Sequence, residues 1–184
     1  MWLRKYSIGG GSFSSNKKIC IVLDTGALLA KYHLIANIGN ADYFVPAEVC
    51  DEVKDRESRE ALELGLNIGR ISVVEPESTS IDEAMRTAKK VGELTKLSRT
   101  DIVVAALALT LRKKCRAVVV ITDDYSLQNL LYHMGIGFKP LRTTGIKKPR
   151  KYRAFCPVCG YVPSSPKETL CPLCGSAIIR KRAS

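Results

Sequence analysis

The sequence predicts an α/β fold in which a parallel sheet is flanked by helices and followed by a small zinc ribbon. Two observations support this prediction. Apolar, strand-like runs alternate with helix-like segments from Ile19 to Leu141, and two Cys-x-x-Cys motifs follow near the C-terminus. We find no internal repeat that would favour a solenoid.

The first half of the α/β region supplies three expected strands and three short expected helices. In chain order these are a buried strand at 19–24, a helix at 25–34, a brief strand at 43–46, helices at 47–55 and 58–66, and a strand at 70–76. Each strand is a short apolar run, and a proline, Pro46, stops the second one.

The second half carries the stronger periodic signals. Residues 80–97 repeat apolar side chains at the 3.6-residue period of one helix face. Residues 101–114 are apolar on nearly all sides, which predicts a central buried helix. The run at 117–122 shows no alternation, as is typical of a parallel strand covered on both faces. A helix at 123–135 and a short strand at 136–141 complete the expected domain.

Positive charge is concentrated at the C-terminal end of the chain. The net charge is +11, and residues 139–184 contribute +10 of it. This asymmetry favours an anionic partner, most simply nucleic acid or the ribosome; a solvated tail kept basic for solubility is the alternative. The candidate RNA-binding residues are Lys147, Lys148, Arg150, Lys151, Arg153, Lys167, Arg180 and Lys181.

Composition also predicts the domain boundaries. We expect a flexible Gly/Ser-rich leader at 1–17, an α/β domain at 18–141, a basic linker at 142–153, a zinc ribbon at 154–180 and a basic tail at 181–184. No apolar run is long enough for a membrane span, and the N-terminal residues lack the pattern of a secretory signal. We therefore expect a cytoplasmic protein.

In a cytoplasmic protein, cysteines are more often thiols or metal ligands than disulfides. Two CPxCG motifs contain Cys156, Cys159, Cys171 and Cys174, and eleven residues separate their two Cys-x-x-Cys pairs. This spacing is typical of a closed, structural zinc site with four thiolates. Two disulfides or a redox motif fit the duplicated spacing poorly. Cys20, Cys50 and Cys115 lie in apolar surroundings and are expected as core residues.

Acidic residues follow the strands at the edge where parallel sheets bind ligands. Asp24 ends the first strand, Asp101 begins the buried helix, and Asp123 and Asp124 end the fourth strand; Glu52 could point toward the same edge. Each aspartate alone is also a common helix N-cap.

Converging carboxylates repel one another unless a cation is present, and hard divalent ions such as Mg²⁺ and Mn²⁺ prefer their oxygen atoms. Ser98 and Asp101 fit a capping pattern, and Ser98 and Thr122 could hydrogen-bond the carboxylates. An acidic cluster together with a basic end predicts metal-assisted phosphodiester hydrolysis.

Four segments carry a resemblance to a known family. CIVLDTGALL, PAEVCDEVKD, LSRTDIVVAALAL and VVVITDDYSLQNL resemble, in order, the acidic blocks of PIN-domain ribonucleases. The CPxCG pair behind them narrows the resemblance to the Nin-one-binding (NOB) endonucleases, and the compact chain is similar to their archaeal members. The resemblance covers nearly all of residues 18–180.

The resemblance implies a PIN-like parallel sheet flanked by helices and an Mn²⁺- or Mg²⁺-dependent endoribonuclease. It implies cleavage of precursor small-subunit rRNA at the mature 3′ end, leaving a 3′-hydroxyl and a 5′-phosphate, on the small ribosomal subunit and with possible assembly-factor partners. A toxin-like PIN ribonuclease acting on tRNA or mRNA, and a non-catalytic zinc-ribbon RNA-binding assembly factor, are the alternatives.

The resemblance also implies roles for single residues. Asp24, Glu52, Asp101 and Asp123 match the four family acids, with Asp124 as a fifth; Glu48 and Asp51 lie in the same block as Glu52. Asp24, Asp101 and Asp123 are expected to hold the first catalytic metal, while Asp124 and Glu52 orient waters or hold a second ion.

Overall fold

The structure is a computed structural model that describes residues 18–36, 38–146, 148–165 and 168–183. The leader expected at 1–17 and the candidate RNA-binding residues Lys147 and Lys167 lie outside the described residues.

The main domain contains a sheet of five parallel strands in the order β3-β2-β1-β4-β5, which confirms the predicted fold class. The strands are β1 (Ile19–Leu23), β2 (Ala41–Val45), β3 (Ile71–Val73), β4 (Ala117–Ile121) and β5 (Gly137–Lys139). The chain builds outward from β1 to β3 and then returns to place β4 on the other side of β1. The strand order therefore reverses between β1 and β4, and ligands of open α/β sheets bind at such switch points.

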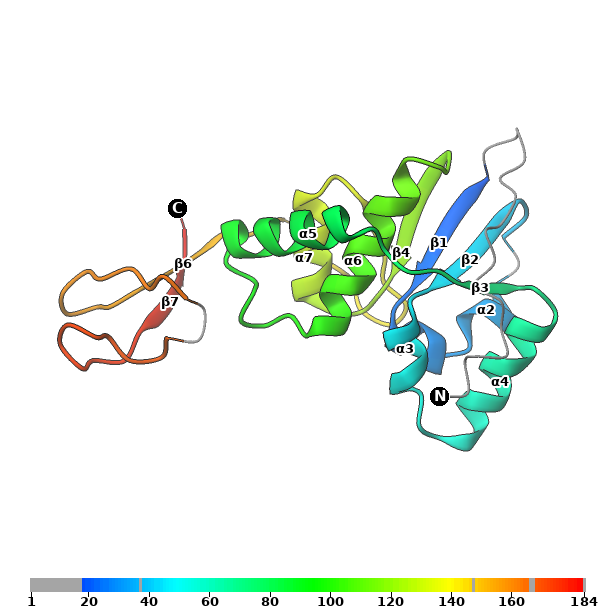
Figure 1. Cartoon of the computed structure of the whole chain (residues 1–184), viewed down its shortest axis with the longest axis horizontal. Coiled ribbons are helices and arrows are strands. Elements are labelled where there is room, and N and C mark those ends of the chain that lie inside the picture. Colours follow the sequence, from blue (N-terminus) through cyan, green and yellow to red (C-terminus); the bar gives the residue numbers. More distant parts are fainter. Residues whose placement is uncertain (1–17, 37, 147, 166–167, 184) are drawn as a thin grey trace.

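Helices cover both faces of the sheet. They are α1 (Thr25–Leu29), α2 (Tyr32–Ile35), α3 (Ala47–Glu52), α4 (Arg56–Asn67), α5 (Ser78–Val91), α6 (Arg99–Arg112) and α7 (Tyr125–His133). Figure 1 shows α2, α3 and α4 on one side of the strands and α5, α6 and α7 on the other, as right-handed crossovers require. Within the described ranges, no helix has the length and apolar character needed to cross a bilayer.

Two predicted helices differ from the observed ones. The single helix expected at 25–34 is divided into α1 and α2, because Lys31 takes a left-handed conformation with φ 54°. This break turns His33 into the interior, where its Nε2 lies 3.1 Å from the Ala61 carbonyl oxygen. The helix expected at 80–97 ends at Val91, where Gly92 provides a left-handed cap with φ 72°.

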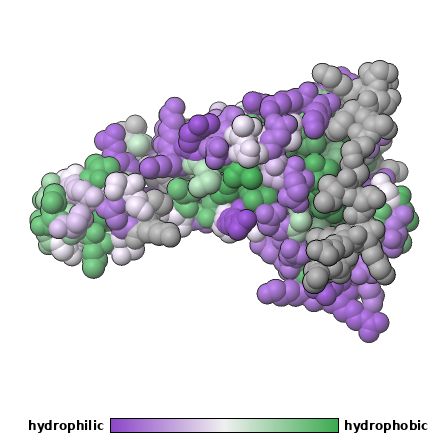
Figure 2. All heavy atoms as spheres, in the orientation of Figure 1, coloured by the Kyte–Doolittle hydropathy of each residue, from purple (hydrophilic) through white to green (hydrophobic). Residues whose placement is uncertain are grey.

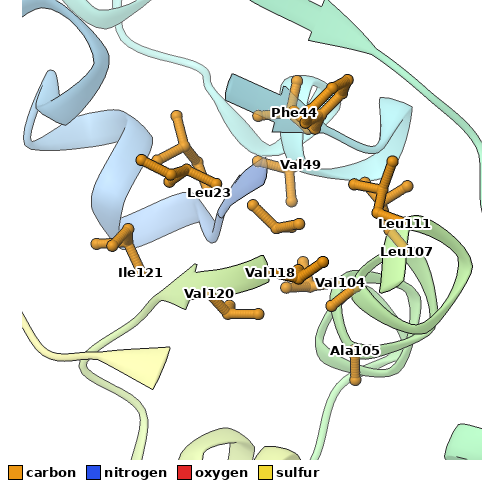
Figure 3. Packing of buried hydrophobic residues seen from close by; sticks show 14 of the residues in the cluster. Leu23, Phe44, Val49, Val104, Ala105, Leu107, Leu111, Val118, Val120 and Ile121 are labelled. Atoms are coloured by element: carbon orange, nitrogen blue, oxygen red, sulfur yellow. The ribbon is translucent and has the colours of Figure 1, made fainter. Parts of the chain in front are cut away.

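The core is centred on α6, as its uninterrupted apolar sequence predicts. All ten residues from Ile102 to Leu111 are buried. Figure 3 shows Leu107 and Leu111 of α6 in one cluster with Phe44 of β2 and Val118 of β4. This packing fixes the first turn of α6, and therefore Asp101, against the ends of the central strands.

Cys20 and Cys115 are core residues, as expected, but they form a disulfide, so the preference for thiols or metal ligands over disulfides is wrong for this pair. Both residues are buried, and their Cα atoms are 6.0 Å apart although 95 positions separate them in the chain. They meet because β1 pairs with β4, with Ile19 opposite Ala117. That pairing is a tertiary contact, which cysteine spacing cannot reveal. Cys50 is buried and free, as expected.

We expect that replacing Cys20 and Cys115 with alanine lowers the free energy of unfolding by about 2–5 kcal/mol, because the bond closes a long loop of the unfolded chain. For a chain of this size, the melting temperature should then fall by roughly 10 °C. Thermal denaturation with and without reductant measures the effect. Each single variant should lose as much unfolding free energy as the double variant, because one cysteine alone cannot form the disulfide. A parent protein that melts at the same temperature in reductant would contradict the prediction.

The C-terminal module is a small two-stranded ribbon that stands apart from the sheet (Figure 1). Its strands, β6 (Tyr152–Phe155) and β7 (Ile179–Arg182), pair antiparallel. The pairing includes Tyr152 and Arg153 from the expected linker range and Lys181 from the expected tail. Val158 and Leu173, near the tips of the two knuckles, are 71% and 72% exposed, and Figure 2 shows apolar atoms at the outer end of the ribbon. Such a module cannot derive its stability from a hydrophobic core.

Arg180 docks the ribbon on the main domain. Its Nη2 lies 2.9 Å from an Oε2 of Glu93, which is 3% exposed, and also donates to the Gly92 carbonyl. The guanidinium lies 3.9 Å above the centre of the Tyr152 ring. A Cβ on Gly92 would come within 2.3 Å of the Tyr152 carbonyl oxygen, so this position requires glycine for close approach as well as for its positive φ.

The linker between the domain and the ribbon is held along α7. Asn129 donates from Nδ2 to the Arg150 carbonyl and accepts at Oδ1 from the Arg150 backbone N–H, both at 2.8 Å. Gln128 accepts from the Ile146 backbone N–H at 2.9 Å. Both amide side chains are buried. The linker therefore has a defined path over the main domain.

Candidate active site

Asp24 lies at the switch point between the ends of β1 and β4. Its Oδ1 accepts from the Thr25 backbone N–H, which caps α1, and its Oδ2 accepts from the hydroxyl of Thr122, each at 2.7 Å. Asp24 is 9% exposed. Burial raises the pKa of this carboxyl, and the neighbouring charges of Asp101 and Asp124 raise it further.

Asp101 reaches the same edge from the first turn of α6. It forms a capping box with Ser98: its backbone N–H donates to the Ser98 hydroxyl at 3.1 Å, and its Oδ2 accepts from the Ser98 N–H at 2.7 Å. Burial raises the pKa of Asp101, although these hydrogen bonds lower it, and repulsion from Asp124 and Glu52 adds to the increase. Asp101 is thus a capping residue and a member of the acidic cluster at once.

Glu52 connects the cluster to α3. Its two carboxylate oxygens accept from the hydroxyls of Thr25 and Thr100. The charge of Glu52 also helps to raise the pKa of Asp101. Thr25 and Thr100 were not expected as site residues. The sequence signal that could have identified them is that Thr25 and Thr100 are direct neighbours of Asp24 and Asp101.

The two adjacent aspartates after β4 point in different directions. Asp124 caps α7, with Oδ1 accepting from the N–H groups of Ser126 at 2.6 Å and Leu127 at 2.8 Å, and its charge acts on Asp24 and Asp101. Asp124 therefore lies close enough to Asp24 and Asp101 to raise the pKa of both carboxyls.

Asp123 instead holds the loop after β5. It accepts from the backbone N–H groups of Leu141 at 2.8 Å, Arg142 at 3.0 Å and Thr143 at 3.2 Å, and from the Thr143 hydroxyl. Burial raises the pKa of Asp123, but these hydrogen bonds outweigh burial and hold the pKa below its ordinary value. Both carboxylate oxygens of Asp123 are bonded to this loop, whereas the cap of α7 uses only Oδ1 of Asp124, so Asp124 is the acid of the pair that has an oxygen left for the cluster.

Asp24, Glu52, Asp101 and Asp124 form the acidic cluster. Two of these carboxyls have raised pKa values, partly through mutual repulsion, which a divalent cation would relieve. In the described part of the chain, these acids do not share the mutual spacing of under 4.8 Å that the four cysteines show. An open arrangement of carboxylates suits Mg²⁺ or Mn²⁺, since Mg²⁺ is usually held by one or two carboxylates and keeps several waters.

No thiol competes for the chemistry at this edge of the described structure. Cys50, in α3, is the one free cysteine outside the knuckles among the described residues. Burial raises the pKa of its thiol to about 12. It is therefore protonated at neutral pH and unsuited to nucleophilic attack.

The four knuckle cysteines form a candidate metal centre. The sulfur atoms of Cys156 and Cys174, and those of Cys159 and Cys171, are 3.4 Å apart, and all four lie within 4.8 Å of one another. A tetrahedral ion with Zn–S bonds of about 2.3 Å needs sulfurs about 3.8 Å apart. The thiols are thus placed to hold one ion.

The two knuckles have the same backbone geometry. In each, the glycine after the second cysteine has positive φ and donates its N–H to the carbonyl of the first cysteine. These bonds run from Gly160 to Cys156 at 3.0 Å and from Gly175 to Cys171 at 2.9 Å. The closed four-thiolate set leaves no ligand position for substrate, which is typical of structural sites.

Comparison with known proteins identifies relatives of this chain. Residues 21–111 match the PIN domain of ribonuclease. The chain is similar to Endoribonuclease Nob1 of Methanothermobacter thermautotrophicus (38% identity) and of Pyrococcus abyssi (36%), each over 162 residues, 88% of this chain and 92% of the relative. It is also similar to Ribonuclease VapC3 of Aeropyrum pernix, with 41% identity over 125 residues, 68% of this chain and 88% of that protein.

The two Nob1 matches extend beyond the main domain into the ribbon. A match to 162 of 184 residues must extend at least to residue 162, so it includes the first knuckle with Cys156 and Cys159 as well as the parallel sheet. The chain belongs to the Nob1 family of PIN-domain endoribonucleases.

Proposed function

We propose that this protein is a divalent-metal-dependent endoribonuclease that cuts precursor small-subunit rRNA at its mature 3′ end during ribosome assembly in the cytoplasm. The observation that carries the proposal is the acidic cluster at the β1/β4 switch point. Three of its members come from segments far apart in the sequence, Asp24, Asp101 and Asp124, and their charges act on one another.

Asp24, Asp101 and Asp124 are the residues that would hold a catalytic Mn²⁺ or Mg²⁺ ion, with Glu52 orienting water beside them. When bound, such an ion lowers the pKa of a coordinated water and neutralises charge on the phosphate. Asp124 takes the role expected for Asp123, because the Asp123 oxygens are bonded to loop 141–143. Thr122 fixes the rotamer of Asp24, and Thr25 and Thr100 fix Glu52.

The four cysteines would hold a structural Zn²⁺, which supplies the folding free energy that the small ribbon lacks. Basic residues of the linker and ribbon would bind the RNA backbone; those exposed in the structure are Lys148, Arg150, Lys151, Arg153 and Lys181. Arg180 is not proposed to bind RNA, because Glu93, the Gly92 carbonyl and the Tyr152 ring already surround its guanidinium.

The similarity to VapC3 supports a second candidate, a toxin-like ribonuclease acting on tRNA or mRNA. That match spans 68% of the chain, and a match to a VapC1 ribonuclease spans 86% at 31% identity, whereas the two Nob1 matches span 88% at the higher identities of 36% and 38%. The ribbon docked by Arg180 is an additional nucleic-acid surface for a large, structured substrate. We therefore favour precursor rRNA.

End mapping tests the proposal. The full-length protein is incubated with Mn²⁺ or Mg²⁺ and a precursor RNA that spans the mature 3′ end, in parallel with tRNA and an mRNA fragment of equal length. One dominant cut at the mature end, leaving a 3′-hydroxyl and a 5′-phosphate, is expected. Preferred cleavage of tRNA or mRNA would support the toxin-like alternative, and no cleavage with either metal would support a non-catalytic assembly factor.

A further inference from the structure

A cavity of about 700 Å³ lies between the main domain and the ribbon. Its walls come from the start of α7, the turn after α5, the linker and the strands β6 and β7. Figure 1 shows the ribbon beyond the end of α5. This volume is in the range of ligand sites in proteins. The buried Gln128 and Asn129 hold the linker wall in place, so the cavity is formed without a ligand.

The cavity adjoins the acidic cluster. Tyr125, which lines it, follows Asp124 directly, so their Cα atoms are about 3.8 Å apart. On its other side, Thr144 and Gly145 continue the loop that Asp123 fixes. A chain of nucleotides whose phosphate lies at the acidic cluster would therefore pass this cavity.

The lining carries unbalanced positive charge. Lys96, Lys148 and Arg182 line the cavity with exposed side chains, and no carboxylate of the described residues forms an ion pair with them. The acid in the wall, Glu93, is already paired with Arg180. The cavity therefore favours an anionic group such as a phosphate.

Two tyrosines line the cavity, and they differ in what covers them. The Tyr152 ring has the Arg180 guanidinium 3.9 Å from its centre and the Lys96 ammonium 5.9 Å from its centre. Tyr125 is 51% exposed and has no aromatic or cation–π partner among the described residues. Tyr125 thus presents an exposed aromatic ring beside a group of cations, the combination that binds single-stranded nucleic acid.

We propose that this cavity binds one unpaired nucleotide near the scissile phosphate, with its base stacked on Tyr125 and its phosphate near Lys96, Lys148 and Arg182. The inference rests on the proposed function, since it takes the substrate to be single-stranded RNA. It adds a base-binding position that selects unpaired RNA at the site of cutting.

Binding of a fluorescent single-stranded oligoadenylate of about twelve nucleotides, within the site sizes of such proteins, tests the proposal. The full-length, zinc-loaded protein is used without Mn²⁺ or Mg²⁺, so the measurement does not depend on cleavage. Tyr125→Ala should weaken binding about tenfold, within the range for loss of one base–aromatic stack. Tyr125→Phe should retain the affinity, and a duplex of the same length should show no effect of Tyr125→Ala.

Two exposed residues outside the cavity supply the controls. Tyr132→Ala removes a tyrosine of α7 that is 52% exposed and does not line the cavity, and it should bind like the parent. Lys148→Ala should reduce the slope of log affinity against log salt by about 0.7, as for one lost phosphate contact on a single strand. Arg116→Ala, just before β4 and outside the cavity lining, should leave the slope unchanged.

Parent-like binding by a folded Tyr125→Ala, or an equal loss in Tyr132→Ala, would overturn the cavity proposal. Melting temperatures establish that each variant is folded, and Tyr125→Leu provides a second variant that keeps an apolar side chain at the start of α7. Because binding is read without cleavage, this failure is distinct from failure of the nuclease proposal, which requires the absence of metal-dependent cutting.

Discussion

Asp24→Asn is expected to reduce metal-dependent RNA cleavage by at least about 100-fold. Loss of a residue that hydrogen-bonds a metal ligand already lowers metal affinity or activity about 10- to 100-fold. Asp24 is placed to be a ligand itself. The variant keeps the shape of the side chain and can still accept the Thr25 N–H. The loss would therefore report the missing charge rather than a disrupted fold. Single-turnover cleavage of the precursor RNA, with titration of Mn²⁺, measures it.

The same substitution should stabilise the metal-free protein at neutral pH. The pKa of Asp24 is raised in the folded state, chiefly by burial. The folded protein therefore binds its proton more tightly than the unfolded chain, and stability falls as pH rises from the unfolded pKa of about 3.9 through the raised value. Asparagine does not titrate, so the stability of Asp24→Asn does not fall in this way as the pH rises. Its melting temperature should exceed that of the parent at pH 7, and the difference should shrink below about pH 4. Added Mn²⁺ should stabilise the parent more than the variant.

The neighbouring aspartates supply the matched comparison. Asp124→Asn should lose cleavage as Asp24→Asn does, since both belong to the acidic cluster. Asp123→Asn should instead lower the melting temperature, because it weakens charge-assisted hydrogen bonds to loop 141–143, with a smaller loss of cleavage. Full cleavage by Asp24→Asn, or a larger loss in Asp123→Asn than in Asp124→Asn, would refute the assignment of these roles.

Cys171→Ser is expected to abolish zinc binding and unfold the ribbon while the parallel sheet remains folded. Structural zinc contributes about 10–16 kcal/mol of binding free energy in small modules of this kind. The ribbon has little else to stabilise it, because its knuckle side chains Val158 and Leu173 are exposed. The main domain has its own core around α6, whose residues from Ile102 to Leu111 do not depend on the ribbon.

Zinc content per chain and NMR spectra measure this outcome. Signals of the ribbon should lose their dispersion while those of the main domain persist, and RNA affinity should fall because the ribbon's cations are no longer fixed. Cys50→Ser serves as the control, since Cys50 lies in α3 away from the knuckles; its zinc content should match that of the parent. A Cys171→Ser protein that retains one zinc per chain would contradict the four-thiolate site.

Several features of the site were predictable because they depend on local pattern. The alternation of apolar runs with helical periods predicts the parallel sheet, and residues that follow parallel strands must lie at one edge of it. Asp24, Asp101 and the pair after β4 could therefore be assigned to one edge of the sheet from sequence. The capping box of Ser98 and Asp101 was visible for the same reason, since it joins residues three positions apart.

Other features depend on contacts between distant segments, and sequence pattern does not contain these. Asp123 and Asp124 are chemically identical neighbours, and only the path of loop 141–143 decides which one turns away from the cluster. Cys20 and Cys115 become partners only when β1 pairs with β4. The linker looks like a flexible basic segment until Asn129 is seen to bind it.

The sequence by itself thus determined the fold class, the four-thiolate site and the edge of the sheet where the acids gather, because each follows from short-range spacing along the chain. The tertiary structure alone decided which acid of the adjacent pair joins the cluster, where the ribbon docks through Arg180 and Glu93, and that a cavity with Tyr125 lies beside the site. Those outcomes depend on the directions of side chains brought together by packing, and sequence spacing does not fix these directions.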